Sequence, residues 1–174
     1  MKSLIQSWFR SDDGASEQQS ALRDLVDALD RLETDHARYL AQFAYLLGRV
    51  AHADQHIAPE EVRTMEALVR QEGNLSEELA VLVIGLARTS NHMFGGTDNF
   101  LIAREFAAHA TYPQRMALLR CLFAVSVSEG HISIADEREI QRIARELRIE
   151  PSDLVSLRLE YRQHLPGLSN RSEP

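Results

Sequence analysis

The chain repeats itself at a constant offset of 75 residues. When residues 47–82 are aligned with residues 122–157 without a gap, eight positions carry the same residue. These identical pairs are Leu47/Leu122, Val50/Val125, His56/His131, Ile57/Ile132, Arg63/Arg138, Arg70/Arg145, Leu79/Leu154 and Leu82/Leu157. A repeat decides the architecture more than any other feature of a sequence. Because acids also stay in register within it, this repeat favours a paired binding element over an enzyme.

Apolar residues recur at helical spacing along almost the whole chain, and no segment alternates in the manner of a strand. Capping residues, prolines and glycines delimit about eight helices. The expected ranges are 17–33, 39–53, 59–73, 76–89, 97–109, 111–128, 134–147 and 151–164. The first two could be one bent helix, and Thr97 or Asp98 is expected to cap the fifth helix after a long loop. We therefore predict an all-α, single-domain bundle of about eight helices, built from two degenerate helix-turn-helix repeats at about 36–89 and 111–164.

Residues 15–165 are expected to form this domain, between an N-terminal amphipathic segment (1–14) and a flexible tail (166–174). Within the N-terminal segment, Leu4, Ile5, Trp8 and Phe9 lie at helical spacing. This segment could pack on the domain or associate weakly with a membrane surface. No stretch approaches the ~18 apolar residues that span a bilayer, and no signal peptide is visible. We therefore expect a cytoplasmic protein.

The net charge of −7 argues against a nucleic-acid partner, because such proteins need surplus Lys and Arg to displace counterions. The single cysteine, Cys121, lies in an apolar run, so we expect a buried core thiol in a reducing compartment. No set of residues suggests a nucleophile with its base. These observations predict a protein without enzymatic activity, acting with an unidentified protein partner.

The repeat places two acids at the same turn between helices. In the first turn these are Asp54 and Glu61, and in the second turn they are Glu129 and Asp136. The first acid of each pair follows a long helix, where the negative end of the helix dipole makes an exposed carboxylate unfavourable by roughly 0.3–1 kcal/mol. Some partner should offset that cost.

Two interpretations of these acids stay open. The first acids, Asp54 and Glu129, could accept backbone N–H groups of the turn or of the next helix, which is a structural role. They could instead hold a divalent cation, with Ca²⁺ the first candidate because it prefers several oxygen ligands. Under the second interpretation the metal ligands are Asp54, Glu61, Glu129 and Asp136. In either case Ile57 and Ile132 are expected to anchor the turns in the core.

The two turns resemble the Ala-Asp-Gly-x-Ile-x-x-x-Glu pattern of the tellurite-resistance TerB family, over about residues 36–163. The first copy runs from Ala53 to Glu61 and the second from Ser128 to Asp136. The resemblance implies an all-helical domain, acidic patches that bind divalent metal, and a cytoplasmic role in stress or in membrane-associated complexes. Gln55 departs from the pattern by replacing its glycine, and Glu129 departs by replacing its aspartate.

Two further groups of residues suggest weaker sites. Arg138, Arg142 and Arg145 form a basic stripe at helical spacing, surrounded by Glu137, Glu139 and Glu146. We expect a solvated, ion-paired face there, with a docking face for an acidic partner as the alternative. Glu105 and His109 are four residues apart and could present two ligands to a transition metal, although scattered surface histidines are the simpler interpretation.

Overall fold

The computed structural model describes residues 16–50, 59–90, 96–127 and 130–165. This part of the chain contains eight α-helices and one short 3₁₀ helix, as the sequence predicts. The helices are α2 (Ser16–Asp30), α3 (Thr34–Gly48), α4 (Pro59–Gly73), α5 (Glu77–Ser90), α6 (Gly96–His109), α7 (Tyr112–Val127), α8 (Ile134–Glu146), α9 (Pro151–Glu160) and η1 (Arg162–His164). No described helix is long and apolar enough to cross a membrane.

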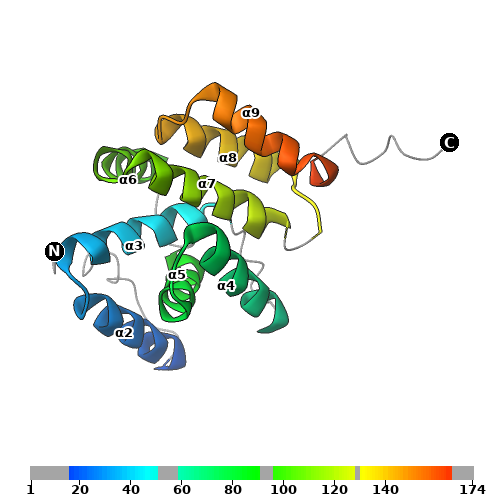
Figure 1. Cartoon of the computed structure of the whole chain (residues 1–174). Coiled ribbons are helices and arrows are strands. Elements are labelled where there is room, and N and C mark those ends of the chain that lie inside the picture. The colour runs from blue at the N-terminus through cyan, green and yellow to red at the C-terminus, as the bar shows by residue number, and fades with distance from the viewer. Residues whose placement is uncertain (1–15, 51–58, 91–95, 128–129, 166–174) are drawn as a thin grey trace.

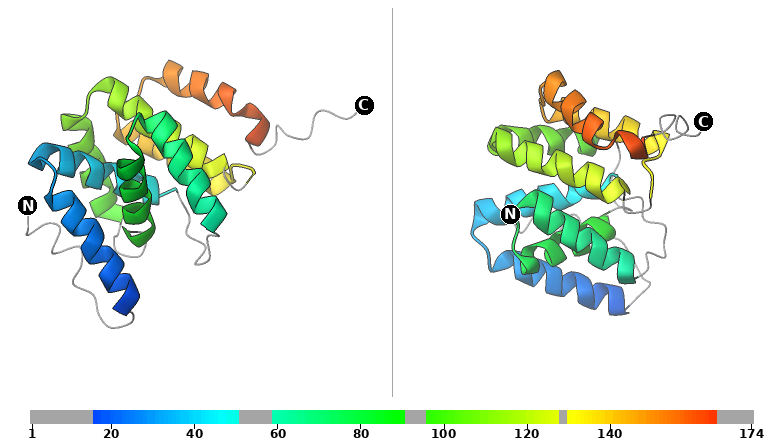
Figure 2. Two further views of the ribbon diagram at one scale, coloured as in Figure 1. Left: turned by 60° about the horizontal axis from the view of Figure 1, so that its bottom comes forward. Right: turned by 45° about the vertical axis from the view of Figure 1, so that its right-hand side comes forward.

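The helices stack in layers around α3 and α7 (Figure 1). In both views of Figure 2, α2 lies at one extreme of the bundle, and α8 and α9 lie at the other. The most extensive packing joins α3 to α5 and α4 to α7. Every residue of α3 from Leu40 to Gly48 is buried, and α7 is buried from Leu118 to Ser126 except at Arg120. These two helices therefore form the centre of a single hydrophobic core.

Several helix ends follow directly from the local sequence. Pro59 and Pro151 open α4 and α9, where a proline suits the first turn because its missing N–H would have no helical partner there. Both α4 and α8 end with a residue at positive φ, Asn74 at 52° and Arg148 at 54°. The next N–H then bonds back to the helix, from Leu75 to Arg70 in one case. This geometry satisfies carbonyls that the helix end leaves open.

Three boundaries differ from those that the sequence predicts. Thr34 begins α3 separately from α2, so the first two helices are not one bent helix. The fifth expected helix begins at Gly96, so Thr97 and Asp98 lie inside α6 and do not cap it. The last helix ends at Glu160, and a 3₁₀ turn continues to His164.

The two halves contain the same order of helices, α3–α4–α5 and α7–α8–α9. Pro59 and Ile134, the first residues of α4 and α8, are related by the same 75-residue offset as the sequence repeat. The repeat itself stays a prediction. The expected N-terminal amphipathic segment and C-terminal tail lie outside the described residues.

Candidate functional site

The structure describes the second acidic turn from Gly130 onwards. A glycine before its isoleucine and a helix cap after it define the backbone conformation of the turn. Gly130 has a φ of 95°, a conformation that glycine adopts without steric cost. Ile132 is fully buried, as expected for the residue that anchors the turn. Ser133 and Asp136 then form a capping box at the start of α8. The Ser133 N–H donates to Asp136 Oδ2 at 3.1 Å, and the Asp136 N–H donates to Ser133 Oγ at 3.1 Å.

The 3₁₀ helix near the end of the described chain also holds this turn. The Ile132 N–H donates to the carbonyl of His164 at 2.8 Å. The imidazole Nδ1 of His164 lies 3.1 Å from the carbonyl oxygen of Gly130. Sequence analysis did not identify this contact, and its two sides are more than thirty residues apart in the chain. The turn is therefore held in place by the capped start of α8 and by the distant 3₁₀ helix.

The structure places the four predicted metal ligands unequally. Asp136 is described, and its carboxylate caps α8, where the positive end of the helix dipole favours an anion. Glu61 lies in the first turn of α4, and its side chain is not described. Asp54 and Glu129 lie outside the described residues. Among the described residues no three His, Cys, Asp or Glu side chains gather as a cation site. Asp136 thus caps α8, whereas the structural interpretation of Asp54 and Glu129 stays a prediction. A cation in this turn would depend on Glu129 and on turn carbonyls for further oxygens.

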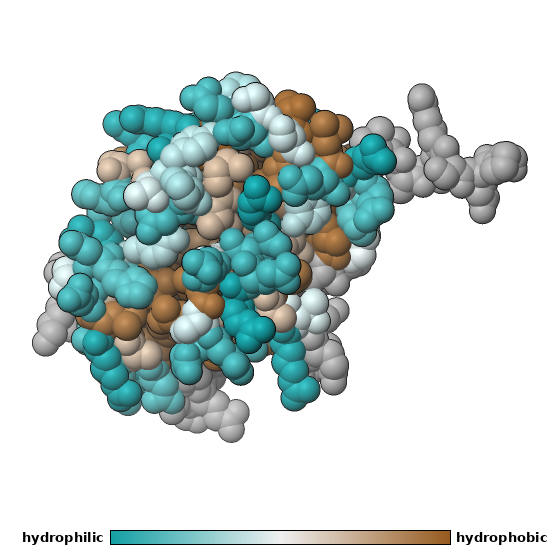
Figure 3. Space-filling view, viewed as in Figure 1, coloured by the Kyte–Doolittle hydropathy of each residue, from teal (hydrophilic) through white to brown (hydrophobic). Residues whose placement is uncertain are grey.

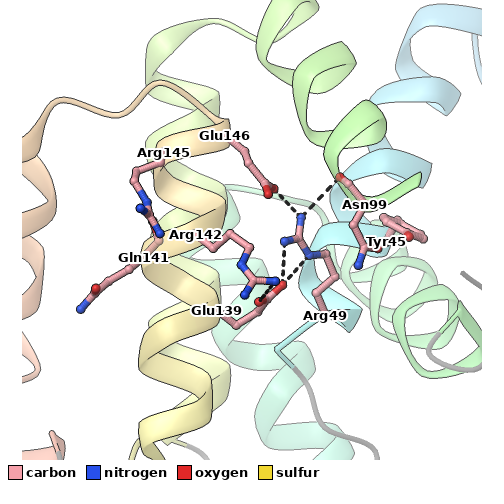
Figure 4. A network of polar contacts seen from close by, with 8 residues as sticks. All are labelled: Tyr45, Arg49, Asn99, Glu139, Gln141, Arg142, Arg145 and Glu146. Atoms are coloured by element: carbon pink, nitrogen blue, oxygen red, sulfur yellow. Dashed lines mark hydrogen bonds and ion pairs between the residues drawn. The ribbon is translucent and has the colours of Figure 1, made fainter. Parts of the chain in front are cut away.

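A network of polar side chains joins the end of α3 to α6 and α8 (Figure 4). The Arg49 guanidinium donates from Nε to Glu139 Oε1 at 2.8 Å and from Nη1 to Glu146 Oε2 at 2.6 Å. Its Nη1 also lies 3.4 Å from the carbonyl oxygen of Asn99. The side chain of Asn99 in turn accepts a hydrogen bond from the Tyr45 hydroxyl. The Arg49 side chain is only 6% exposed, and those of Glu139 and Glu146 are 19% and 11% exposed. This cluster is the most extensive polar group in the described interior.

The electrostatics of this cluster favour the charged state of the arginine. Burial alone lowers the pKa of the Arg49 guanidinium, because a charge loses hydration there. The hydrogen bonds and charges of Glu146 and Glu139 outweigh burial, so the pKa of Arg49 is raised above its ordinary value. Two carboxylates of α8 face the guanidinium at the end of α3. Ion pairs as well as hydrogen bonds therefore join the two halves of the bundle.

The basic stripe differs from the solvated face that the sequence predicts. Glu139 and Glu146 turn inward to Arg49, although Glu139 also lies 3.5 Å from Arg142 Nη1. Glu137 pairs with Arg158 on α9. Arg138 and Arg145 are exposed. The glutamates therefore connect helices, and among ion pairs between described residues, Arg142 alone of the three arginines has the pair expected on this face.

The single thiol lies in the core, as predicted. Cys121 is fully buried on α7, with Sγ 4.0 Å from the carbonyl oxygen of Val69 on α4. Burial raises the pKa of the Cys121 thiol well above its ordinary range, so the thiol stays protonated and unreactive in the folded protein.

Comparison with known proteins identifies the family. The sequence profile described as tellurite resistance protein TerB matches residues 40–159. This match runs from α3 to α9, includes both acidic turns and covers more than half of the chain. The chain belongs to the TerB family. Searches of curated proteins and of solved structures found no similar protein. The TerB match agrees with the all-helical fold that the resemblance of the turns implies.

Proposed function

We propose that this TerB domain is a non-catalytic interaction module of the cytoplasm that takes part in a stress response of the tellurite-resistance type. The observation that carries the proposal is the family match across both turns and the whole central core. Within the described residues, ion pairs and helix caps are among the polar contacts that hold the helices together. Such an arrangement supports a rigid element that presents its turns to another molecule.

The more specific form of the proposal is that the acidic turns bind a divalent cation, with Ca²⁺ the first candidate. Asp54 and Glu129 would act with Glu61 and Asp136, together with carbonyl oxygens of the turns. The capped start of α8 and the His164 contacts support this form, because they fix the backbone on which Asp136 stands. Hard cations bind through such oxygen atoms, and two carboxylates per turn suit a weak site better than a tight one.

A thermal melt of metal-stripped protein tests the cation proposal. Ca²⁺, Mg²⁺, Zn²⁺ and Mn²⁺ are added singly to the wild type, to the Asp54→Ala/Glu129→Ala variant, and to Asp24→Ala/Glu33→Ala as a control. The control removes the same two residue types from exposed positions on α2 and just before α3. A ligand that binds only the folded state adds ~2.7 kcal/mol at a hundred times its Kd. We expect a saturable shift that the control keeps and the turn variant loses.

A second variant separates the structural role of the turn from ion binding. Ser133→Ala removes the hydroxyl of the capping box without removing any carboxylate, so we expect it to lower the free energy of unfolding by about 1 kcal/mol. The ion-induced shift should persist in this variant. If no ion shifts the melt of the wild type, the cation proposal is wrong and the acids act only as helix caps.

Docking of a protein without a metal is the second candidate. Val155 and Leu159 are exposed one turn apart on α9, where Figure 3 shows a small hydrophobic patch on a mostly hydrophilic face. Partner capture that survives chelation and is lost in Val155→Ser/Leu159→Ser would support this candidate. A membrane-peripheral adaptor that uses residues 1–14 would instead show liposome flotation that Trp8→Ala abolishes.

A further inference from the structure

A cleft of about 780 Å³ opens near the N-terminal end of α3. Its walls come from α3, the end of α4, the end of α6 and the start of α7, so both halves of the bundle contribute. The volume falls within the ~300–1,000 Å³ that is usual for small-molecule sites. Gln42, the cleft residue nearest to Arg49 along α3, lies about 10 Å from it at 1.5 Å per residue. No described residue that lines the cleft belongs to the polar network of Arg49.

Gln42 is a buried polar side chain in the wall of this cleft. It is 6% exposed and lies on α3 between the fully buried Leu40 and Phe43. Its amide makes no hydrogen bond with any described residue, and neither amide atom is fully shielded from solvent. Water in the cleft therefore reaches the amide in the free protein. Because a carboxamide offers both a donor and an acceptor, its position in the wall of the cleft favours a ligand with matching hydrogen-bonding groups.

Tyr39, one turn before Gln42, supplies a flat surface and a second hydrogen-bonding group. Its ring stacks on Phe106 of α6 with the ring centroids 5.4 Å apart. The hydroxyl makes no hydrogen bond within the described part of the chain. Burial raises the pKa of Tyr39 to about 12, so the hydroxyl is a protonated donor at neutral pH.

The formal charges along the cleft largely cancel. Asp35 and Arg38 both line it, and their charged groups lie 3.6 Å apart, so each partly neutralises the other. His36 and His109 are exposed at the rim. The half-apolar wall includes Pro113, which adds a second flat contact surface. An ionised ligand would lose hydration here without gaining an opposite charge, whereas a neutral polar ligand would not.

We propose that this cleft binds a small uncharged molecule that carries a planar amide, of about the size of a nicotinamide or a nucleoside. The ligand amide would pair with the carboxamide of Gln42, which offers both a donor and an acceptor. The ligand carbonyl would accept a hydrogen bond from the Tyr39 hydroxyl, and the flat ring of the ligand would lie against the Tyr39 side chain. The proposal does not depend on cation binding at the turns.

NMR titration of ¹⁵N-labelled protein tests this assignment. The probes are nicotinamide and uridine, with nicotinate as an ionised control of the same size as nicotinamide. We expect saturable shifts of the Gln42 side-chain NH₂ signals with nicotinamide or uridine and no saturable shift with nicotinate. In Gln42→Met, binding should weaken by about tenfold, which corresponds to the loss of a hydrogen bond of about 1.4 kcal/mol. Gln71→Met makes the same change at an exposed position on α4 and should bind as the wild type does.

The thermal stability of the variants gives a second, independent measurement. Because Gln42 has no partner in the free protein, Gln42→Met should keep or raise the melting temperature. Tyr39→Phe removes only the hydroxyl and should weaken binding while the fold is retained, so it serves as the test if Gln42→Met does not fold. The proposal is wrong if neither amide probe binds, if nicotinate binds equally well, or if binding is unchanged in both variants. A lower melting temperature of folded Gln42→Met would also contradict it, since Gln42 would then have a structural role.

Discussion

The two halves of the bundle use the same order of helices but pack by different means. In the first half, α3 approaches α5 so closely that a Cβ atom added at Gly48 would lie 2.7 Å from the carbonyl oxygen of Ala87. In the second half, side chains attach α9 to its neighbours: Tyr112 donates to Asp153, and Phe123 stacks on Tyr161 with the ring centroids 5.2 Å apart. Repetition in sequence therefore does not require repetition of packing.

The junction between the halves depends on charge. Arg49 leaves the first half at the end of α3 and contacts Glu139 and Glu146 of the second half. An arginine is uncommon in a protein interior, because a buried charge is tolerated only when an opposite charge pairs with it. Close backbone packing thus marks the first half and side-chain pairs mark the second half, and an ion cluster joins the two.

The largest effect is expected at the junction. Arg49→Met removes the partner of the largely buried Glu146 and leaves Glu139 with the exposed Arg142 alone among the described residues, so the free energy of unfolding at pH 7 should fall by about 3–5 kcal/mol. Denaturant unfolding measures this loss. Arg142→Met is the matched control, because Arg142 also pairs with Glu139 but is 62% exposed, and it should cost about 0–1 kcal/mol. Equal losses in the two variants would show that the Arg49 cluster does not join the halves.

An intermediate effect is expected at the close contact of the first half. Gly48→Ala forces the new methyl group against the backbone of α5, so we expect a loss of about 1–3 kcal/mol by thermal or denaturant unfolding. Gly73→Ala is the control, since its Cβ would meet the Leu75 and Cys121 side chains at 3.4 and 3.5 Å. A Gly48→Ala variant as stable as the Gly73→Ala control would show that close backbone packing of α3 against α5 does not distinguish the first half.

The smallest effect concerns the ends of α4 and α8. Arg148 adopts a left-handed conformation that costs a non-glycine residue about 1–2 kcal/mol, so Arg148→Gly should raise the free energy of unfolding by about 1 kcal/mol. Asn74→Gly should change it less, because asparagine tolerates this conformation. Denaturant unfolding of both variants measures the two changes in the free energy of unfolding. A larger increase for Asn74→Gly than for Arg148→Gly would contradict the assignment of strain to Arg148.

Local signals predicted most of the fold. Pro59, Ser133 and Pro151 mark helix starts by their own chemistry, and the apolar run around Cys121 predicts a buried helix. The predicted start of the fifth helix was wrong, because α6 begins at Gly96, a residue type that by local propensity favours a loop over a helix. The Asn99 side chain in the first turns of α6 is anchored by Tyr45, a contact 54 residues away that no local signal contains.

The candidate sites were less predictable than the helices. The acids of the turns are visible in the repeat, but their partners depend on backbone geometry, and only Asp136 shows its role among the described residues. The Arg49 cluster was missed because its carboxylates lie 90 and 97 residues further along the chain. One signal could have found it: Arg49 is the only charged residue in the mostly apolar run from Tyr39 to Ala51. Gln42 carries the same kind of signal on the same helix.

The position of Cys121 has a consequence for the chemistry that the domain can withstand. The sequence has one thiol, and it is fully buried and protonated between α4 and α7. Peroxides, electrophiles and soft metal ions attack the thiolate, and none of them can reach this sulfur without separating the two helices. Oxidants and soft metal ions that modify exposed cysteines would therefore leave this thiol reduced for as long as the domain stays folded.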